Sequence, residues 1–87
     1  MRPLNYAILK YFTTVEEACA AQVYEAIKGE YGNYRMCTPK AINLAVMTAE
    51  KNGLLEESRY ELDANGELVI YYHAVGEGLD AINSFIK

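Results

Sequence analysis

The sequence predicts a small α+β domain of three helices, an antiparallel β-hairpin and a short C-terminal helix. Apolar residues recur with the period of a helix up to about residue 53, and the period changes to two after Leu54-Leu55. The dipeptide Asn65-Gly66 then joins two strand-like runs, which is the strongest short hairpin signal. With 87 residues, the chain is expected to form one domain over residues 1–87.

The first two helices are predicted from apolar spacing and end signals. Pro3 fits a first helical position, and an apolar stripe follows it to Phe12. Residues 14–17 have the pattern of a capping box, in which the Thr14 hydroxyl bonds the Glu17 N–H, so the second helix is expected to begin there. It should end at Gly29 or Gly32. Residues 31–34 then predict a turn, whose two tyrosines would be hard to bury.

The third helix has the clearest boundaries. Thr38 is a preferred N-cap, Pro39 fits the first position, and Asn52-Gly53 predicts the end. At 100° per residue, one face carries the apolar residues Ile42, Ala45, Val46 and Ala49. The outward face carries Lys40, Asn43, Leu44, Met47, Thr48 and Lys51.

Residues 59–63 and 67–73 are the predicted hairpin strands. A two-residue type I′ turn at Asn65-Gly66 needs positive φ at both residues and would pair Leu62 with Val69. The second strand is apolar on both faces, so it is expected nearer the centre of the sheet. A last short helix would present four apolar residues on one side, namely Leu79, Ile82, Phe85 and Ile86.

This order of elements resembles the winged helix-turn-helix transcriptional regulators of the PadR and MarR type. Residues 48–57, from Thr48 through Gly53-Leu54, look like the end of the family's recognition helix and its entry into the wing. Residues 71–79 look like the exit from the wing. The resemblance implies one winged-helix domain with a two- or three-stranded antiparallel wing. The wing tip departs from the family, because Asp63 and Glu67 stand where basic residues are usual.

The resemblance implies a small DNA-binding regulator that reads the major groove with the helix at residues 39–52. Lys40 and Lys51 would contact phosphates, and Asn43 and Thr48 would contact base edges. The remaining nucleic-acid contacts are assigned to Tyr34, Arg35, Asn65 and Gly66. Charge opposes this hypothesis: the chain has a net charge of −4, and residues 33–74 contain four basic and six acidic residues.

The alternative is a winged-helix adaptor that binds protein without DNA. Leu44 and Met47 lie in the middle of the predicted outward face, and exposed apolar residues mark partner surfaces. They could equally pack under the first helix or in a homodimer seam. Self-association is also expected from the last helix, because little chain remains to cover Leu79, Ile82, Phe85 and Ile86.

Other classes of function are not expected. His73 is the one histidine, and it has no triad partner at a recognisable spacing. Cys19 and Cys37 lack the spacing of metal ligands, and no phosphate-binding glycine loop occurs, so no enzyme activity, metal or cofactor is expected. Neither a membrane span nor a signal peptide is present, which predicts a cytoplasmic protein with reduced cysteines.

Overall fold

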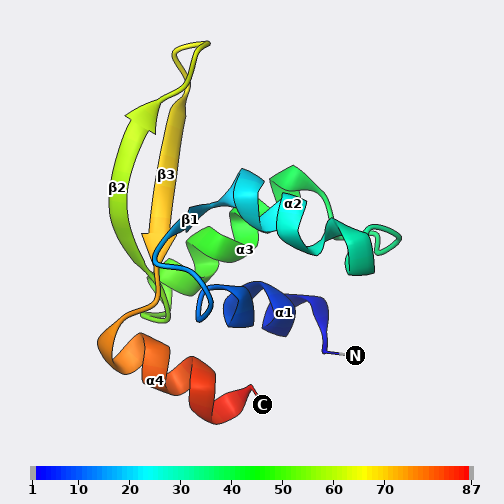
Figure 1. Ribbon diagram of the computed structural model, residues 1–87, viewed down its shortest axis with the longest axis vertical. Helices are drawn as coiled ribbons and strands as arrows, with labels where there is room; N and C mark the ends of the chain where they lie inside the picture. The colour runs from blue at the N-terminus through cyan, green and yellow to red at the C-terminus, as the bar shows by residue number, and fades with distance from the viewer. Residues whose placement is uncertain (1, 87) are drawn as a thin grey trace.

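Four helices and three antiparallel strands build residues 2–86, the part of the chain that the computed structural model describes. Their order is α1 (Leu4–Tyr11), β1 (Ala18–Cys19), α2 (Ala20–Tyr31), α3 (Pro39–Lys51), β2 (Glu56–Leu62), β3 (Leu68–His73) and α4 (Gly76–Phe85). The sheet has the order β1-β3-β2. The β2–β3 hairpin extends beyond the helices at one end, and α4 lies at the other (Figure 1). The predicted α+β class, with β3 central in the sheet, is confirmed.

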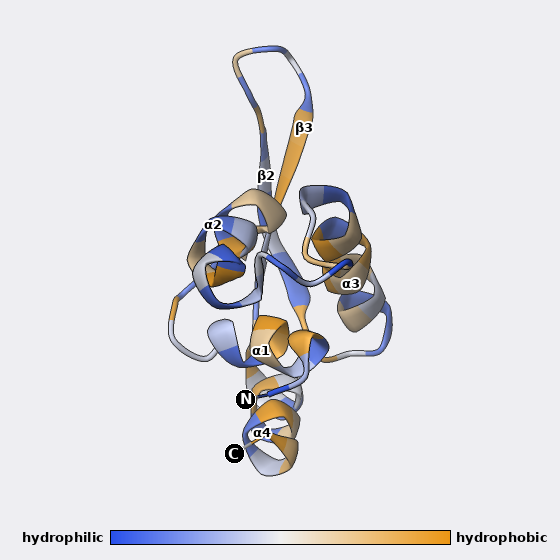
Figure 2. Ribbon diagram, turned by 90° about the vertical axis from the view of Figure 1, so that its right-hand side faces the viewer, coloured by the Kyte–Doolittle hydropathy of each residue, from blue (hydrophilic) through white to orange (hydrophobic). Residues whose placement is uncertain are grey.

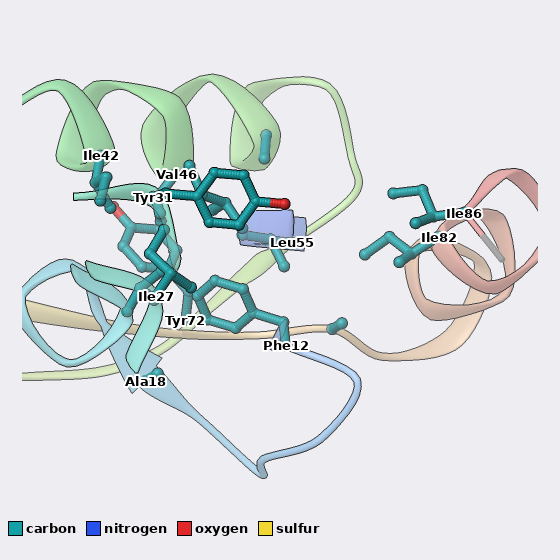
Figure 3. Close-up of a cluster of buried hydrophobic side chains, with 14 of the residues drawn as sticks. Phe12, Ala18, Ile27, Tyr31, Ile42, Val46, Leu55, Tyr72, Ile82 and Ile86 are labelled. Carbon is teal, nitrogen blue, oxygen red and sulfur yellow. The ribbon is translucent and has the colours of Figure 1, made fainter. Parts of the chain in front are cut away.

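The core lies between helices α1 to α3 and one face of the sheet. Its largest fully buried side chains include Phe12, Ile42 and Leu55. Figure 3 shows side chains from α2, α3 and the sheet converging on this cluster, with Tyr72 beneath them. No helix within residues 2–86 has the length and apolar character needed to span a lipid bilayer.

The second helix begins five residues later than the capping-box pattern predicted, with Cys19 and not Thr14 at the N-cap. The Thr13 and Thr14 hydroxyls donate back to the carbonyls of Lys10 and Tyr11, each at 2.7 Å, so they close α1 instead of opening α2. Ala18 and Cys19 pair with β3, and α2 follows directly, with the Cys19 N–H donating to the Gln22 side chain at 3.1 Å. The capping-box prediction was wrong because pairing with the distant β3 strand holds these two residues in the sheet.

Both ends of α3 lie where the sequence predicts them. The Thr38 hydroxyl accepts a hydrogen bond from the Ala41 N–H at 3.1 Å, Pro39 begins the helix, and Gly53 follows the end with a φ of +79°. The turn before α3 differs in one respect. Tyr31 is buried, and its hydroxyl donates to the Arg2 carbonyl at 2.6 Å, so the expectation that it is hard to bury was wrong.

The hairpin turn is a three-residue loop and not a two-residue type I′ turn. Only Gly66 has a positive φ, of +76°. The Asp63 N–H donates to the Glu67 carbonyl and the Gly66 N–H to the Asp63 carbonyl, each at 2.9 Å, which is a type I turn followed by a left-handed glycine. The register therefore shifts by one, and Leu62 pairs with Leu68, not Val69.

The new register changes which side chains share a face. Tyr60 now lies opposite Ile70, so Tyr60 and Leu62 belong to the face that carries the buried Tyr72. An irregularity in the pairing lies between Glu57 and Arg59. The distal part of this face has no helix over it, and Tyr60, Leu62 and Leu68 are exposed there.

Helix α4 packs its apolar side into the chain's own core. Ile82 and Ile86 are buried, and their side chains point toward the cluster of Phe12 and Leu55 (Figure 3). Leu79 is half-buried, and Phe85 is 80% exposed. The expectation that too little chain remains to cover these residues was wrong for Ile82 and Ile86, because α1 packs against α4. Lys10 Nζ also donates to Asn83 Oδ1 at 3.0 Å and to the Ile86 carbonyl at 2.9 Å.

Candidate functional site

The outward face of α3 carries a straight stripe of exposed side chains. Lys40, Leu44, Met47 and Lys51 follow one another at helical spacings of four, three and four residues, and all are exposed. Lys40 and Lys51 are eleven positions apart, which corresponds to about 16 Å along the helix axis at 1.5 Å per residue. Asn43 and Thr48 flank the stripe and are exposed as well. The predicted division of α3 into a buried and an exposed face is confirmed.

The polar groups on this face differ in what they can still bind. Thr48 Oγ1 donates to the Leu44 carbonyl at 2.9 Å, so its hydroxyl proton is used and its lone pairs and methyl group face outward. The Asn43 amide lies 3.6 Å from Met47 Sδ, a weak acceptor, and stays exposed. Neither Lys40 nor Lys51 forms an ion pair with any side chain in residues 2–86.

The loop before α3 contains two further residues predicted to contact nucleic acid, Tyr34 and Arg35. The Tyr34 ring packs edge-on against Tyr31, with 5.0 Å between ring centroids. Arg35 follows it, is exposed, and makes no ion pair within the described chain. Both side chains line a shallow hollow of about 650 Å³ together with the start of α1. Arg35 thus lies beside the start of α1, and along the chain it is five positions before Lys40.

The hairpin tip is less suited to an anion. Asn65 and Gly66 lie at the end of the hairpin that projects beyond α2 and α3 (Figure 2). The Asp63 carboxylate accepts from the N–H groups of Asn65 at 2.8 Å and Glu67 at 2.9 Å. The loop therefore fixes one carboxylate at the tip, and Glu67 adds an exposed second one. A phosphate that contacted this tip would be repelled by the two carboxylates.

Arg59 is held away from the α3 face by a network on the other face of the sheet. Its guanidinium donates to Glu17 and to Glu61, each at 2.8 Å, and stacks 3.9 Å from the centre of the Tyr71 ring. The Ser58 hydroxyl donates to Glu17 at 2.7 Å. Hydrogen bonds from Ser58 and Arg59 hold the pKa of Glu17 below its usual value, and those from Arg59 and Tyr71 do the same for Glu61. Arg59 is therefore committed to this cluster.

The fold separates the charges of the chain. Residues 2–12 and 33–55, which form α1, α3 and the loops beside them, contain five Lys or Arg residues and one carboxylate, Glu50, for a net charge of +4. The rest of the chain contains three basic and eleven acidic residues, for a net charge of −8. The negative net charge of the chain therefore comes from residues outside α1, α3 and the loops beside them, which a count over residues 33–74 does not reveal.

An apolar groove between α1 and α3 was not predicted from the sequence. It has a volume of about 390 Å³, and its walls include Leu4 and Ile8 of α1, Leu44 and Ala45 of α3, and Met36 of the loop. No ionisable side chain lines it. The apolar stripes of both helices are visible in the sequence, but the fact that these two helices pack side by side with a hollow between them depends on the tertiary fold.

The residues predicted as a protein interface fall into two groups. Leu44 and Met47 are exposed by 56% and 41%, and Phe85 is the most exposed of all. Ile82 and Ile86 belong to the core, so they are not available to a partner in this fold. For Leu44, Met47 and Phe85 the interface role stays a prediction.

Comparison with known proteins adds no relative to this description. No protein-family model matches the chain, and no curated protein matches it significantly.

Proposed function

We propose that this chain is a winged-helix protein that binds DNA by placing α3 in the major groove. The order of elements supports the assignment, because α2 and α3 form a helix-turn-helix and the β2–β3 hairpin forms the wing. The pairing of β1 with β3, at the base of the hairpin, agrees with this layout. The observation that carries the proposal is that α3 presents Lys40, Asn43, Thr48 and Lys51 together and exposed, within segments of the chain whose net charge is positive.

The spacing of these groups suits a helix lying in the groove. The major groove of B-DNA is about 12 Å wide, and lysines about 16 Å apart along a helix can reach phosphates on both of its sides. Asn43 can pair with an adenine edge, and Thr48 can accept a hydrogen bond from a base amino group. Leu44 and Met47, between the lysines, would contact thymine methyl groups. Arg35 would add a phosphate contact beside the start of the helix.

The acidic tip has no phosphate contact in this proposal. Because Asp63 and Glu67 place two carboxylates beside Asn65 and Gly66, the proposal leaves out the backbone contact that the sequence predicted for these two residues. Three cations then carry the phosphate contacts, namely Arg35, Lys40 and Lys51. Two copies of the chain acting as a homodimer would double this number, and the exposed Phe85 is the α4 residue that such a dimer could still use.

Matched removal of single charges tests the proposal. Lys40→Gln or Lys51→Gln should weaken binding to short fluorescent duplexes several-fold, measured by anisotropy at low salt. Lys28→Gln removes an exposed lysine of α2 that pairs with Glu25 at 2.7 Å, and should leave binding unchanged. Equal losses in all three variants would contradict the assignment of α3 as the DNA-binding element, since bulk charge alone would then explain the effect.

The apolar groove beside α3 favours a second candidate function, the binding of a protein.

A further inference from the structure

The apolar groove continues beyond the space between α1 and α3. The groove and the shallow hollow at the start of α1 share Leu4, Asn5 and Met36, so the two depressions adjoin at the N-terminal part of α1, and we refer to the pair as the channel. Helices α1 and α3 lie side by side along it (Figure 2). The channel follows α3 from Ala41 to Asn52, which is about 16 Å of helix.

The side chains along this channel are more exposed than large apolar residues usually are. Met36 is 61% and Leu44 is 56% exposed, and Tyr6 and Tyr34 are each nearly half exposed. They are contiguous, because all four line one or other of the two depressions. A continuous apolar patch rimmed by polar groups marks an interaction surface, and methionine is common on such surfaces because its side chain adapts to its partner.

Both walls of the groove are helices, and this arrangement favours a helix as the ligand. α1 contributes Leu4 and Ile8, and α3 contributes Ala41, Leu44, Ala45 and Thr48, each at helical spacing. Rows of side chains at these spacings accept the ridges of another helix. A third helix laid between α1 and α3 would insert its own apolar row at positions i, i+3, i+4 and i+7.

The charges around the channel favour a helix with acidic side chains. Among the lining residues, Arg35 is the one that is charged at neutral pH, and Lys40 and Lys51 flank Leu44 along α3. The carboxylate of α3, Glu50, is two residues from Thr48 and therefore turned well away from the groove. The rim thus offers three cations and no nearby acid among the lining residues.

We propose that the groove between α1 and α3 binds an amphipathic, acidic α-helix of a partner protein. Its apolar row packs against Leu4, Met36 and Leu44, and carboxylates beside that row meet Lys40 and Lys51 along α3 and Arg35 near the start of α1. This interaction does not require DNA binding. Because both ligands use Lys40 and Lys51, the helix and DNA compete for the chain.

Three synthetic peptides of about 16 residues test the proposal. The first has leucine at i, i+3, i+4 and i+7 with flanking glutamates, the second has lysine in place of every glutamate, and the third has the first peptide's composition with the leucine row scrambled. The acidic amphipathic peptide should bind the wild-type chain at least about tenfold more tightly than either control, a difference of about 1.4 kcal/mol. Amide chemical shifts of Leu4, Ala41 and Ala45 should change on its binding.

Two matched variants locate the site. Leu44→Asp should abolish binding of the acidic peptide, and Leu62→Asp should not, although Leu62, on the hairpin, is even more exposed than Leu44. Circular dichroism spectra like that of the wild type should show that both variants are folded.

Four results would overturn the proposal. The lysine peptide could bind as well as the acidic one, or the folded wild type could bind none of the three. Leu62→Asp could abolish binding while Leu44→Asp does not, which would place the docking surface on the hairpin. Sedimentation could detect a dimer of the wild-type chain that persists when the peptide is added but is absent in Leu44→Asp. The groove would then be occupied by a second copy of the chain. DNA binding is measured in the separate duplex assay, so a failure of the peptide-binding proposal can be distinguished from a failure of the DNA-binding proposal.

Discussion

Arg59 Nε lies 2.8 Å from Glu17 Oε2, and this ion pair ties the segment before β1 to the edge strand β2. The pair joins two parts of the chain that are 42 residues apart. Glu61 and the Tyr71 ring hold the guanidinium from two other directions. The network fixes the path of the chain between α1 and β1, and it also removes one arginine and two carboxylates from the charges that a ligand at α3 would meet.

The Glu17 contacts predict a loss of stability in acid. Hydrogen bonds from Ser58 and Arg59 lower the pKa of Glu17 in the folded state below its usual 4.5. The contribution of Glu17 is therefore fully present above the unfolded pKa and is lost as pH falls through the folded pKa. Urea unfolding at pH 7 and pH 3 should show a smaller acid-induced loss for Glu17→Gln than for wild type. Glu16→Gln, which removes a neighbouring exposed carboxylate, should behave like wild type; an identical change in both variants would contradict the role of the network.

Replacing either of the two threonines with N-cap patterns should change the free energy of unfolding by a different amount. Thr38 caps α3 through the Ala41 N–H, so Thr38→Ala should lower the free energy of unfolding by about 0.5–2 kcal/mol. Thr14 caps no helix N-terminus, and its hydroxyl bonds back to the Tyr11 carbonyl at the end of α1, so Thr14→Ala should cost less. Thermal or urea unfolding measures both. A larger loss for Thr14→Ala would indicate that α2 begins at residue 14 after all.

The hairpin loop gives a test of the turn type. Gly66 has a φ of +76°, so Gly66→Ala should destabilise the chain by about 1–2 kcal/mol, the cost of a left-handed conformation for a residue with a Cβ. Asn65 does not have a positive φ, so Asn65→Ala should be tolerated. A type I′ turn would penalise both substitutions, and comparable losses in the two variants would restore that turn and its register.

Helix α4 predicts opposite outcomes for two apolar residues three positions apart. Ile82 is 1% exposed, so Ile82→Ala should cost about 2–5 kcal/mol. Phe85 is 80% exposed, so Phe85→Ala should stay within about 0.5 kcal/mol at protein concentrations where the chain is monomeric. Ile82→Val, at about 0.5–1.5 kcal/mol, keeps the measurement possible if the alanine variant does not fold. A tolerated Ile82→Ala would mean that α4 is not docked as described.

The elements that were predicted correctly are those whose signals are local. Thr38, Pro39 and Gly53 act on the backbone within a few residues of themselves, so the bounds of α3 could be predicted from the sequence alone. The exposed face of α3 could be predicted in the same way, from the helical period of its apolar residues. The charges were harder to interpret, because a net charge does not tell which side of the fold each residue occupies.

The errors arose where distant segments decide the structure. Residues 14–17 have a valid capping pattern, but the pairing of Ala18 with Tyr72 holds the chain in the sheet beyond them. The hairpin register depends on the Asp63 carboxylate, which accepts two backbone N–H groups and favours the longer loop. The groove between α1 and α3 requires both helices to be placed in space, and no spacing in the sequence encodes it.

The salt dependence of DNA binding tests the central claim most directly. If Arg35, Lys40 and Lys51 each neutralise one phosphate, the logarithm of the binding constant should fall with the logarithm of salt concentration with a slope of about −2.7. Affinity for a short duplex should then drop about 40-fold between ~50 and ~200 mM salt, and Lys40→Gln should make the slope shallower by about one. The absence of saturable binding at ~50 mM salt by folded protein, or binding that does not depend on salt, would contradict the assignment of α3 as a DNA-binding helix.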